Sequence, residues 1–410
     1  MLPYGKQTIE QDDIDAVTDA LRSNWLTTGP RVREFEEAFA EMTSSKYAVA
    51  LSSGTAALHA AMQIIGMRKN VVSIEEKSKS QAEVIVPAIT FAATSNAAIY
   101  AGAKPVFADV SPETLLIDLE DVKRKITDNT QAIVAMDYAG QPCDYNSLRA
   151  ICDEHDLVLI SDACHSLGGS MNQRPVGSLA DLTCFSLHPI KQITSGEGGI
   201  VTTDNRFAAE AIKTFRNHGI TTDHRQREKL AKHQYAMETL GFNYRLTDIQ
   251  CALGMSQLKK LPRFTSRRNE VAGLYNSLLA ECDFVRPLGK RDGVEHAHHL
   301  YVIRWDSEKT GITRDQAFEM LRERGIGVNV HYQPVYQHPY YEREFGEQNG
   351  CCPNAESVYE EILSLPIFPT ITEPDIRLVV SELKAVAQSD ATSVRQISAT
   401  PPPTSLRKVG

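Results

Sequence analysis

The chain has 410 residues, of which 42% are hydrophobic and 23% charged, and its formal net charge is −9 at pH 7. This length suggests two or three soluble domains, and the negative charge disfavours nucleic acid as a partner. No run of about 18 apolar residues occurs, so we expect neither a membrane-spanning helix nor a membrane partner. Eight scattered cysteines without a C-x-x-C motif, and a start without an apolar signal core, favour the cytoplasm.

The first two-thirds of the chain alternates helical and strand patterns. Residues 11–23 have helical spacing, with Ile14, Val17 and Leu21 on one face. Short apolar strands then alternate with helical stretches, which predicts right-handed crossovers and a mostly parallel sheet, so that the fold class is α/β. The predicted strands are 46–52, 83–87, 104–110, 131–137, 157–163, 181–187 and 199–204, and the predicted helices between them are 55–66, 90–102, 119–126 and 147–156. In such sheets, ligands bind beyond the carboxyl ends of the strands.

After about Leu246 the pattern changes to long helices and then to a smaller alternating set. The predicted elements are helices at 246–261, 263–280, 314–324 and 355–363 and strands at 299–305 and 327–332. We therefore expect a large domain over residues 1–250 and a smaller C-terminal α/β domain over 251–388. The polar stretch 68–83 is interpreted as a surface insertion, and the Ser-, Thr- and Pro-rich end, 389–410, as a disordered tail.

Two strand ends carry residues that suit an anionic or charged ligand. In "SSGTAAL", a glycine turn at Gly54 leads into a helix at Thr55, where backbone N–H groups and a hydroxyl suit a phosphate; alone, this motif is more often a plain helix cap. Asp162 ends an apolar strand, where it either pairs with a cation or caps the next turn. His165, close behind it, either lies over a ligand edge or caps the same turn.

Lys191 lies in the polar, glycine-rich bridge "HPIKQITSGEGG" between two predicted strands. A single loop lysine is usually an ordinary solvated charge. An enzyme that uses pyridoxal phosphate, however, needs a lysine that forms a Schiff base and an acid that faces the ring nitrogen. A phosphate-type turn, Asp162 and Lys191 all fall at strand ends, and Ser186 adds a hydroxyl, so together they favour this chemistry.

The "HAHH" stretch, from His296 to His299, resembles a metal-binding motif. No acidic or cysteine partner stands at ligand spacing, so we expect a surface loop and no bound metal. The "GEGG" stretch from Gly196 to Gly199 is too short for a nucleotide-binding loop and is expected to allow a tight turn.

Across almost its whole length the sequence resembles the sugar-nucleotide aminotransferases of the DegT–DnrJ–StrS family, a branch of the fold-type-I pyridoxal-phosphate enzymes. The stretches that carry the resemblance are "WLTTGP", "SSGTAALHAA", "AGQPCD", "DACHSLGG", "FSLHPIKQITSGEGG", "FRNHGI", "GFNYRLTDIQCALG" and "VHYQPVY". Within the family the chain is most similar to enzymes that aminate UDP-linked 4-keto-6-deoxy-N-acetylhexosamines, the UDP-4-amino-4,6-dideoxy-N-acetyl-β-L-altrosamine transaminases of pseudaminic-acid synthesis. Two departures are the insertion before residue 83 and the Pro-rich tail.

The resemblance implies a role for each matched position. Lys191 matches the Schiff-base lysine, Asp162 the acid on the ring nitrogen, and His165 a residue near the cofactor's phenolic oxygen. The other implied cofactor contacts are Gly54, Thr55 and Ser186 at the phosphate, Phe91 stacked on the ring, and Asn243 reaching the phosphate of the partner subunit in a homodimer. Implied substrate contacts are Arg245, His331 and Tyr332.

The implied activity is the transfer of the amino group of L-glutamate to a keto-sugar nucleotide, with pyridoxal phosphate as cofactor. One alternative is a sugar dehydratase of the same family, but dehydratases carry histidine where this chain has Lys191. The other alternative is a non-catalytic regulator on the same fold, which an intact Lys191 and Asp162 disfavour.

Overall fold

Seven strands form one large sheet in the computed structural model, which describes residues 1–65, 81–222 and 235–389. The strand order is β1-β9-β8-β5-β4-β2-β3. Only β9 is antiparallel to its neighbours, so the expected mostly parallel sheet is confirmed. The strands are β1 (Tyr47–Leu51), β2 (Glu83–Pro87), β3 (Lys104–Ala108), β4 (Thr130–Met136), β5 (Val158–Asp162), β8 (Leu182–Ser186) and β9 (Gly199–Thr203).

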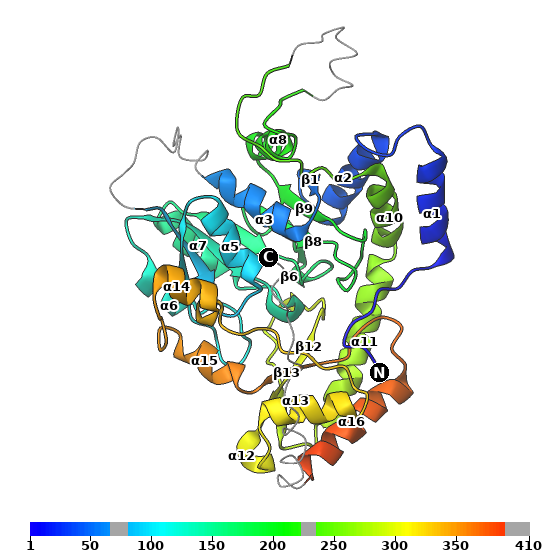
Figure 1. The fold of residues 1–410 in the computed structure, drawn as a ribbon, viewed down its shortest axis with the longest axis vertical. Coiled ribbons are helices and arrows are strands. Elements are labelled where there is room, and N and C mark those ends of the chain that lie inside the picture. Colours follow the sequence, from blue (N-terminus) through cyan, green and yellow to red (C-terminus); the bar gives the residue numbers. More distant parts are fainter. Residues whose placement is uncertain (66–80, 223–234, 390–410) are drawn as a thin grey trace, which may run out of the picture.

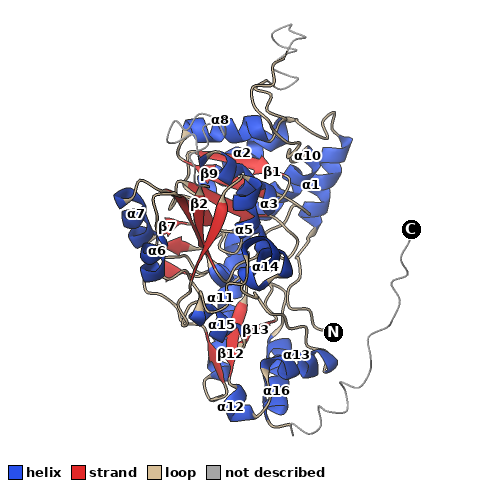
Figure 2. Ribbon diagram, turned by 60° about the vertical axis from the view of Figure 1, so that its left-hand side comes forward, coloured by secondary structure: helices blue, strands red, loops and turns tan. Residues whose placement is uncertain are grey.

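Helices cover both faces of this sheet. Figure 2 shows α6 (Leu119–Lys125) and α7 (Tyr145–Glu154) on one side and α3 (Gly54–Gln63) and α5 (Ala92–Tyr100) on the other. The other helices of this part are α1 (Gln11–Arg22), α2 (Pro30–Met42), the 3-10 turn η1 (Tyr138–Gly140), α8 (Arg206–Phe215), α10 (Asp248–Leu258) and α11 (Leu261–Leu279). None of the helices within the described ranges is long and apolar enough to cross a membrane.

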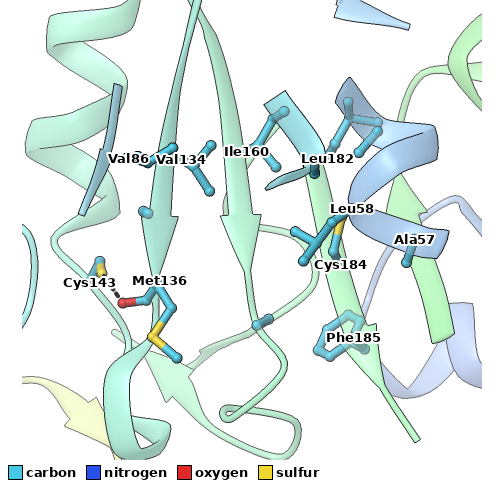
Figure 3. Close-up of a cluster of buried hydrophobic side chains, with 14 of the residues drawn as sticks. Ala57, Leu58, Val86, Val134, Met136, Cys143, Ile160, Leu182, Cys184 and Phe185 are labelled. Carbon is cyan, nitrogen blue, oxygen red and sulfur yellow. Dashed lines mark hydrogen bonds between the residues drawn. The ribbon is translucent and has the colours of Figure 1, made fainter. Parts of the chain in front are cut away.

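The core of this part lies between the sheet and its helices. Figure 3 shows Val86, Val134 and Ile160 side by side on neighbouring strands, with Leu58 of α3 packed nearby. Each of these side chains is at most 2% exposed. Burial of one such side chain stabilises the fold by roughly 1.5–3 kcal/mol. The strands are therefore fixed in place, and the loops at their carboxyl ends are held on a rigid base.

A second core surrounds a smaller sheet at the opposite end of the molecule from α8 (Figure 1). Its strands are β10 (Val285–Pro287), β12 (Tyr301–Trp305) and β13 (Ile362–Leu365), and its helices are α12 (Ser307–Thr310), α13 (Arg314–Glu323) and α16 (Glu373–Ala387). The predicted strand at 299–305 and helix at 314–324 are confirmed. The division of the chain at residue 250 stays a prediction, as do the insertion at 68–83 and the tail at 389–410, which fall almost wholly outside the described residues.

The predicted strand at 327–332 is wrong. This segment forms only single bridges, from Ile326 to Leu2 and from Asn329 to Ser364, and then leaves the sheet. The third strand is instead β13, part of which the sequence assigned to a helix. That helix, α15 (Pro353–Tyr359), stops earlier, because the buried residues of β13 pair with β12.

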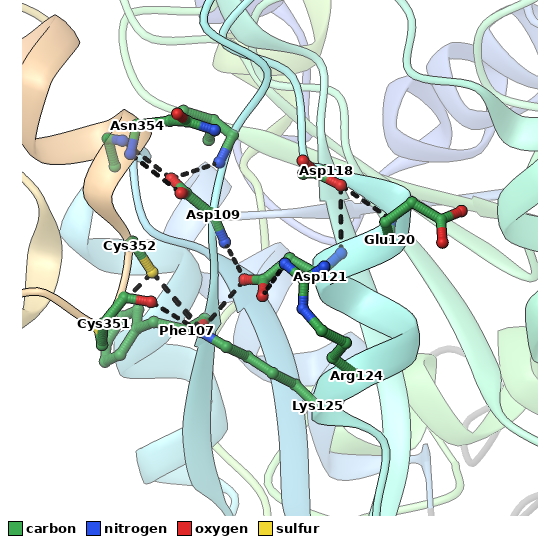
Figure 4. A network of polar contacts seen from close by, with 12 residues as sticks. Phe107, Asp109, Asp118, Glu120, Asp121, Arg124, Lys125, Cys351, Cys352 and Asn354 are labelled. Atoms are coloured by element: carbon green, nitrogen blue, oxygen red, sulfur yellow. Dashed lines mark hydrogen bonds and ion pairs between the residues drawn. The ribbon is translucent and has the colours of Figure 1, made fainter.

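The segment after residue 334 returns to the large sheet as η2 (Val335–Gln337), α14 (Pro339–Phe345) and α15. Figure 4 shows how it is attached. The Asp109 carboxylate accepts hydrogen bonds from Asn354 N (3.0 Å) and from Ala355 N (2.8 Å). Lys125 Nζ donates to the Cys351 carbonyl at 3.2 Å and to Phe107 O at 2.5 Å. A carboxylate at a helix N-terminus satisfies N–H groups that have no partner within the helix, so Asp109, directly after β3, caps α15.

A third, short sheet joins two distant segments. It contains β6 (Ser170–Met171), β7 (Arg174–Pro175) and β11 (Val294–Glu295), in the order β11-β6-β7. Through β11, the chain just before the "HAHH" stretch is paired with the segment that follows His165.

Helix α1 is confirmed, but its apolar face is not buried: Ile14 is 50% and Leu21 57% exposed. The buried residues are Ala20 and Asp13. Asp13 binds Lys260 Nζ at 2.7 Å and accepts hydrogen bonds from Ser256 Oγ (2.7 Å) and Gln257 Nε2 (2.8 Å). Burial acts to raise the pKa of Asp13, but these partners hold this pKa below its usual value. Helix α1 is therefore fixed by an ion pair to Lys260, directly before α11, and by hydrogen bonds to Ser256 and Gln257 of α10.

We expect Lys260→Met to lower the free energy of unfolding by about 3 kcal/mol, because loss of one partner leaves the Asp13 charge buried and uncompensated. The matched control is Lys259→Met, at an exposed neighbouring position, where we expect a change within about 0.5 kcal/mol. Urea unfolding followed by circular dichroism measures both values. Equal effects of the two substitutions would contradict this role of Lys260.

Candidate active site

The sequence-predicted residues meet at one edge of the large sheet. Strands β1, β5 and β8 run in the same direction, so their carboxyl ends share this edge. Gly54 and Thr55 follow β1, Asp162 ends β5, Ser186 ends β8, and Lys191 lies in the loop from β8 to β9. The edge is the one at which ligands bind in parallel sheets.

The Asp162 carboxylate is 2% exposed and is held by two hydrogen bonds. Thr94 Oγ1, on α5, donates to Oδ2 at 2.6 Å, and Cys164 N donates to Oδ1 at 3.2 Å. The interpretation as a cap of the following turn is therefore confirmed, and the pairing of the carboxylate with a cation stays a prediction. No ion pair joins it to a cation within the described ranges.

The turn after β1 needs two glycines for close approach. A Cβ on Gly54 would lie 2.8 Å from Ser186 Cβ, and a Cβ on Gly199 would lie 2.1 Å from the Ser53 carbonyl oxygen. Ser53 Oγ also accepts a hydrogen bond from Ala56 N at 3.0 Å, so the turn is a helix cap as well. The result places the Ser186 hydroxyl against the N-terminus of α3, an arrangement that suits a phosphate.

Lys191 is half-buried, and its Nζ lies 3.3 Å from His299 Nε2. Withdrawal of the amine from water lowers the pKa of Lys191, while Cys164 and Asp162 act in the opposite direction. Gln192 Nε2 donates to the carbonyl of His165, which ties the lysine loop to the turn after β5.

The expectation that the "HAHH" stretch is a surface loop is wrong. His296 is 8% and His299 4% exposed, and the His299 ring lies 4.3 Å from the His165 ring, measured between centroids. His299 is thus a site residue that sequence reasoning missed. The signal that could have found it is its position directly before an apolar strand, since such a residue is held at the end of a buried element. Thr94 was also missed, and a threonine inside a helix gives little signal.

Of the implied substrate contacts, Tyr332 lies in the site. Its hydroxyl is 3.1 Å from His165 Nε2, and its ring lies 5.9 Å from that of Phe91, which is 56% exposed. The neighbouring His331 is instead occupied with structural hydrogen bonds to Ser364 Oγ (2.8 Å) and to Asn329 Nδ2 (3.2 Å). Burial lowers the pKa of His331 to about 3, so this ring is neutral at pH 7.

Asn243 and Arg245 lie on the segment that leads into α10. The Asn243 side chain is exposed, and Arg245 Nη1 donates to Asn217 Oδ1 at 2.9 Å. The carbonyl of Tyr244 accepts a hydrogen bond from Ser52 N at 2.8 Å, so this segment borders the turn at Gly54. The structure therefore does not bring the Asn243 side chain into the buried part of the site of the same chain.

These residues fit pyridoxal phosphate. The cradle at Gly54 suits its phosphate, the carboxylate of Asp162 suits a protonated ring nitrogen, and the amine of Lys191 suits its aldehyde. His165 Nδ1 is buried and has no hydrogen-bond partner among the described residues, so it is available to a ligand oxygen. Burial, and then the charge of Lys191, hold the pKa of His165 well below its usual range, so this ring is neutral.

Comparison with known proteins identifies the fold of the chain and the family to which it belongs. The chain has the fold of the type I enzymes that use pyridoxal phosphate, which confirms the expected fold class. Residues 7–384 match the sequence profile of the DegT/DnrJ/EryC1/StrS aminotransferase family, and the chain belongs to this family. It is therefore an aminotransferase, and its cofactor is pyridoxal phosphate.

Three similar proteins illustrate the likeness. The spore coat polysaccharide biosynthesis protein SpsC of Bacillus subtilis is 36% identical over 390 residues, or 94% of this chain and 97% of that protein. Helicobacter pylori PseC, an aminotransferase involved in pseudoaminic acid biosynthesis, superposes with a TM-score of 0.86 at 31% identity and covers 94% of this chain and 99% of its own. The putative sugar aminotransferase Spr1654 of Streptococcus pneumoniae, in its PMP form, has a TM-score of 0.86 at 29% identity, with 95% and 99% covered.

We expect Gly54→Ala to weaken the binding of pyridoxal phosphate at least about tenfold, or about 1.4 kcal/mol, because the added Cβ must displace Ser186. The matched control is Gly273→Ala on α11, where a Cβ would meet no atom within 4 Å. Titration of each apoenzyme with the cofactor, followed by absorbance, gives the affinities. Unchanged affinity in Gly54→Ala would show that Gly54 does not shape the phosphate site.

Proposed function

We propose that the protein transfers the amino group of L-glutamate to the keto carbon of a nucleotide-linked sugar, with UDP-4-keto-6-deoxy-N-acetylhexosamines as the first class to test. The observation that carries this proposal is the amine of Lys191 at the sheet edge that also holds Asp162. PseC acts in pseudoaminic acid biosynthesis and SpsC in spore coat polysaccharide biosynthesis, which supports a sugar substrate. We further propose that the protein is a cytoplasmic homodimer.

Each residue of the site would contact a different part of the cofactor. Lys191 Nζ would hold the cofactor's aldehyde carbon, and Asp162 would keep the ring nitrogen protonated. Pyridoxal phosphate, when bound, supplies a ring that withdraws electrons from the carbon next to the transferred nitrogen. The remaining contacts are Gly54, Thr55 and Ser186 with the phosphate, Phe91 with the ring face, and His165 with the phenolic oxygen.

Proton movement would fall to Lys191. Once the amino donor has displaced it, its Nζ is free to take the proton from the donor's α-carbon and to deliver it to the neighbouring carbon on the cofactor side. A lowered pKa makes the unprotonated amine accessible near neutral pH, as a general base requires. Tyr332 and Arg245 would then contact the sugar nucleotide.

The dehydratase alternative is disfavoured because a histidine takes the place of this lysine in dehydratases, and the regulator alternative because the complete set of groups is present. Incubation of the enzyme with ¹⁵N-glutamate and a panel of keto-sugar nucleotides separates the three. Amino transfer predicts ¹⁵N in the sugar product. A deoxygenated sugar without ¹⁵N would identify a dehydratase, and binding without any conversion would identify a regulator.

We expect borohydride to fix the cofactor covalently to Lys191 and to no other lysine. Lys191→Ala should remain folded but lose all turnover, because Lys191 is the amine that would both hold the aldehyde and move the proton. Lys46→Ala, at an exposed position, should behave as the wild type. Peptide mass spectrometry locates the label, and a label on a different lysine would overturn the assignment.

The homodimer is supported by an exposed apolar surface beside Asn243. Tyr235 is 62%, Met237 64% and Leu240 78% exposed, and Phe242 is also exposed. Contiguous exposed apolar surface commonly marks a protein interface. A two-fold interface would repeat each contact and create two equivalent sites, each completed by Asn243 of the partner subunit.

We expect inactive Lys191→Ala chains and inactive Asn243→Ala chains to restore activity when their subunits exchange. If Asn243 acts on the site of the other subunit, both lesions in a mixed dimer fall in one site, and the other site is wild type. If it acts within its own subunit, each site carries one lesion, and activity stays no higher than in the Asn243→Ala parent. That second result, with exchange shown by mass spectrometry, would refute the shared site.

A further inference from the structure

The Lys191 amine lies in surroundings that destabilise its positively charged form. In the proposed reaction, this amine takes a proton and holds it before giving it up, so it is for a time an ammonium ion. An ammonium ion withdrawn from water is destabilised unless hydrogen-bond acceptors replace the lost water. Asp162 and Cys164 favour the ion, but the structure shows no hydrogen bond from Lys191 to either within the described ranges.

His299 supplies the missing contact, since its Nε2 lies 3.3 Å from Lys191 Nζ. The ring must be neutral to accept a hydrogen bond from an ammonium ion. Burial, and then the charge of Lys191, hold the pKa of His299 well below its usual range, so it is neutral near pH 7. The titratable and charged groups that face this pair are Asp162, Cys164, His165, Arg268 and His331.

The position of the His299 ring is set by two distant elements. Arg268, on α11, donates through Nη1 to the carbonyls of His298 (3.1 Å) and His299 (3.3 Å). On the other side, Leu300 N donates to the Ala139 carbonyl at 3.1 Å, in the turn after β4. The backbone is therefore held on both sides at the point where the ring projects toward Lys191.

The position of the ring lowers stability at its other nitrogen. His299 Nδ1 is buried and has no hydrogen-bond partner among the described residues, and a buried polar atom without a partner destabilises the fold. Unsatisfied polar atoms that lower stability are expected at functional sites.

We propose that His299 is a positioning residue for the reaction: its Nε2 accepts a hydrogen bond from Lys191 Nζ and so holds the amine in place while, as an ammonium ion, it carries the transferred proton. This role rests on the proposed function. It assigns to the "HAHH" stretch a task in proton transfer rather than in metal binding.

The test compares His299→Phe, which cannot accept a hydrogen bond, with His299→Gln, whose amide oxygen can. The control is His298→Gln, in the same segment but without contact to Lys191. The first readout is the pH dependence of reductive methylation at Lys191 in the pyridoxamine form of the full-length enzyme, measured by peptide mass spectrometry. Loss of an acceptor disfavours the ammonium form, so in His299→Phe the midpoint should move about one pH unit lower, while His299→Gln and His298→Gln should stay near the wild type.

The second readout is kinetic. In His299→Phe, kcat should fall about tenfold or more with little change in the KM for glutamate, and the isotope effect with α-deuterated glutamate should rise, because proton transfer becomes slower. His299→Gln should recover most of this loss. If His299→Phe does not fold, His299→Leu and His299→Asn, whose side chains cannot reach the amine as an acceptor, replace it.

An unchanged midpoint and an unchanged isotope effect in a folded His299→Phe enzyme would overturn the proposal. Failure of the proposed function gives a different result: the wild type itself would then not convert glutamate, while the methylation midpoint would still report whether His299 holds Lys191.

Discussion

The carboxylate of Asp162 lies almost completely out of water, at the end of a central strand, where the Thr94 hydroxyl and the Cys164 N–H donate hydrogen bonds to it. Burial of an ion without a counter-ion costs several kcal/mol, and each hydrogen bond to a charged group returns about 1.5–3 kcal/mol. The fold therefore holds at the sheet edge a buried carboxylate that forms no ion pair with the described residues, and this group suits a cationic part of a ligand. The order of the parallel strands decides what surrounds that charge, because it brings the turn at Gly54 and the lysine loop to the same edge.

The site has an inner and an outer layer. The inner layer consists of loops that follow strands of the large sheet. The outer layer comes from later in the chain: Arg268 fixes the backbone at His299, and the segment with Tyr332 returns toward α5 before α15 is capped by Asp109. The smaller sheet therefore helps to fix His299, which contacts Lys191, and Tyr332, which contacts His165. Neither residue lies on a strand of that sheet.

Much of the large sheet and the inner layer could be predicted from the sequence, because buried parallel strands are short apolar runs, and polar residues at their ends stand out. The outer layer could not. The prediction of a strand at 327–332 was wrong because the alternating apolar and polar residues there have two different roles. Asn329 forms a bridge to the smaller sheet, and Tyr332 lies in the site. The histidines were misplaced because three histidines within four residues resemble a surface loop, and the pairing of β11 and the contacts of Arg268 that bury the stretch are not visible in the sequence. In α1 the apolar residues suggested a buried face, but the polar residue Asp13 lies on the side of the helix that is buried.

We propose that the carboxylate of Asp162 pairs with the cofactor's ring nitrogen. The most direct test is ¹⁵N nuclear magnetic resonance of the enzyme reconstituted with pyridoxal phosphate labelled at this nitrogen. We expect a resonance typical of a protonated ring nitrogen in the wild type at neutral pH, and a shift to the unprotonated position in Asp162→Asn. An unprotonated nitrogen in the wild type, or the same resonance in both proteins, would contradict it.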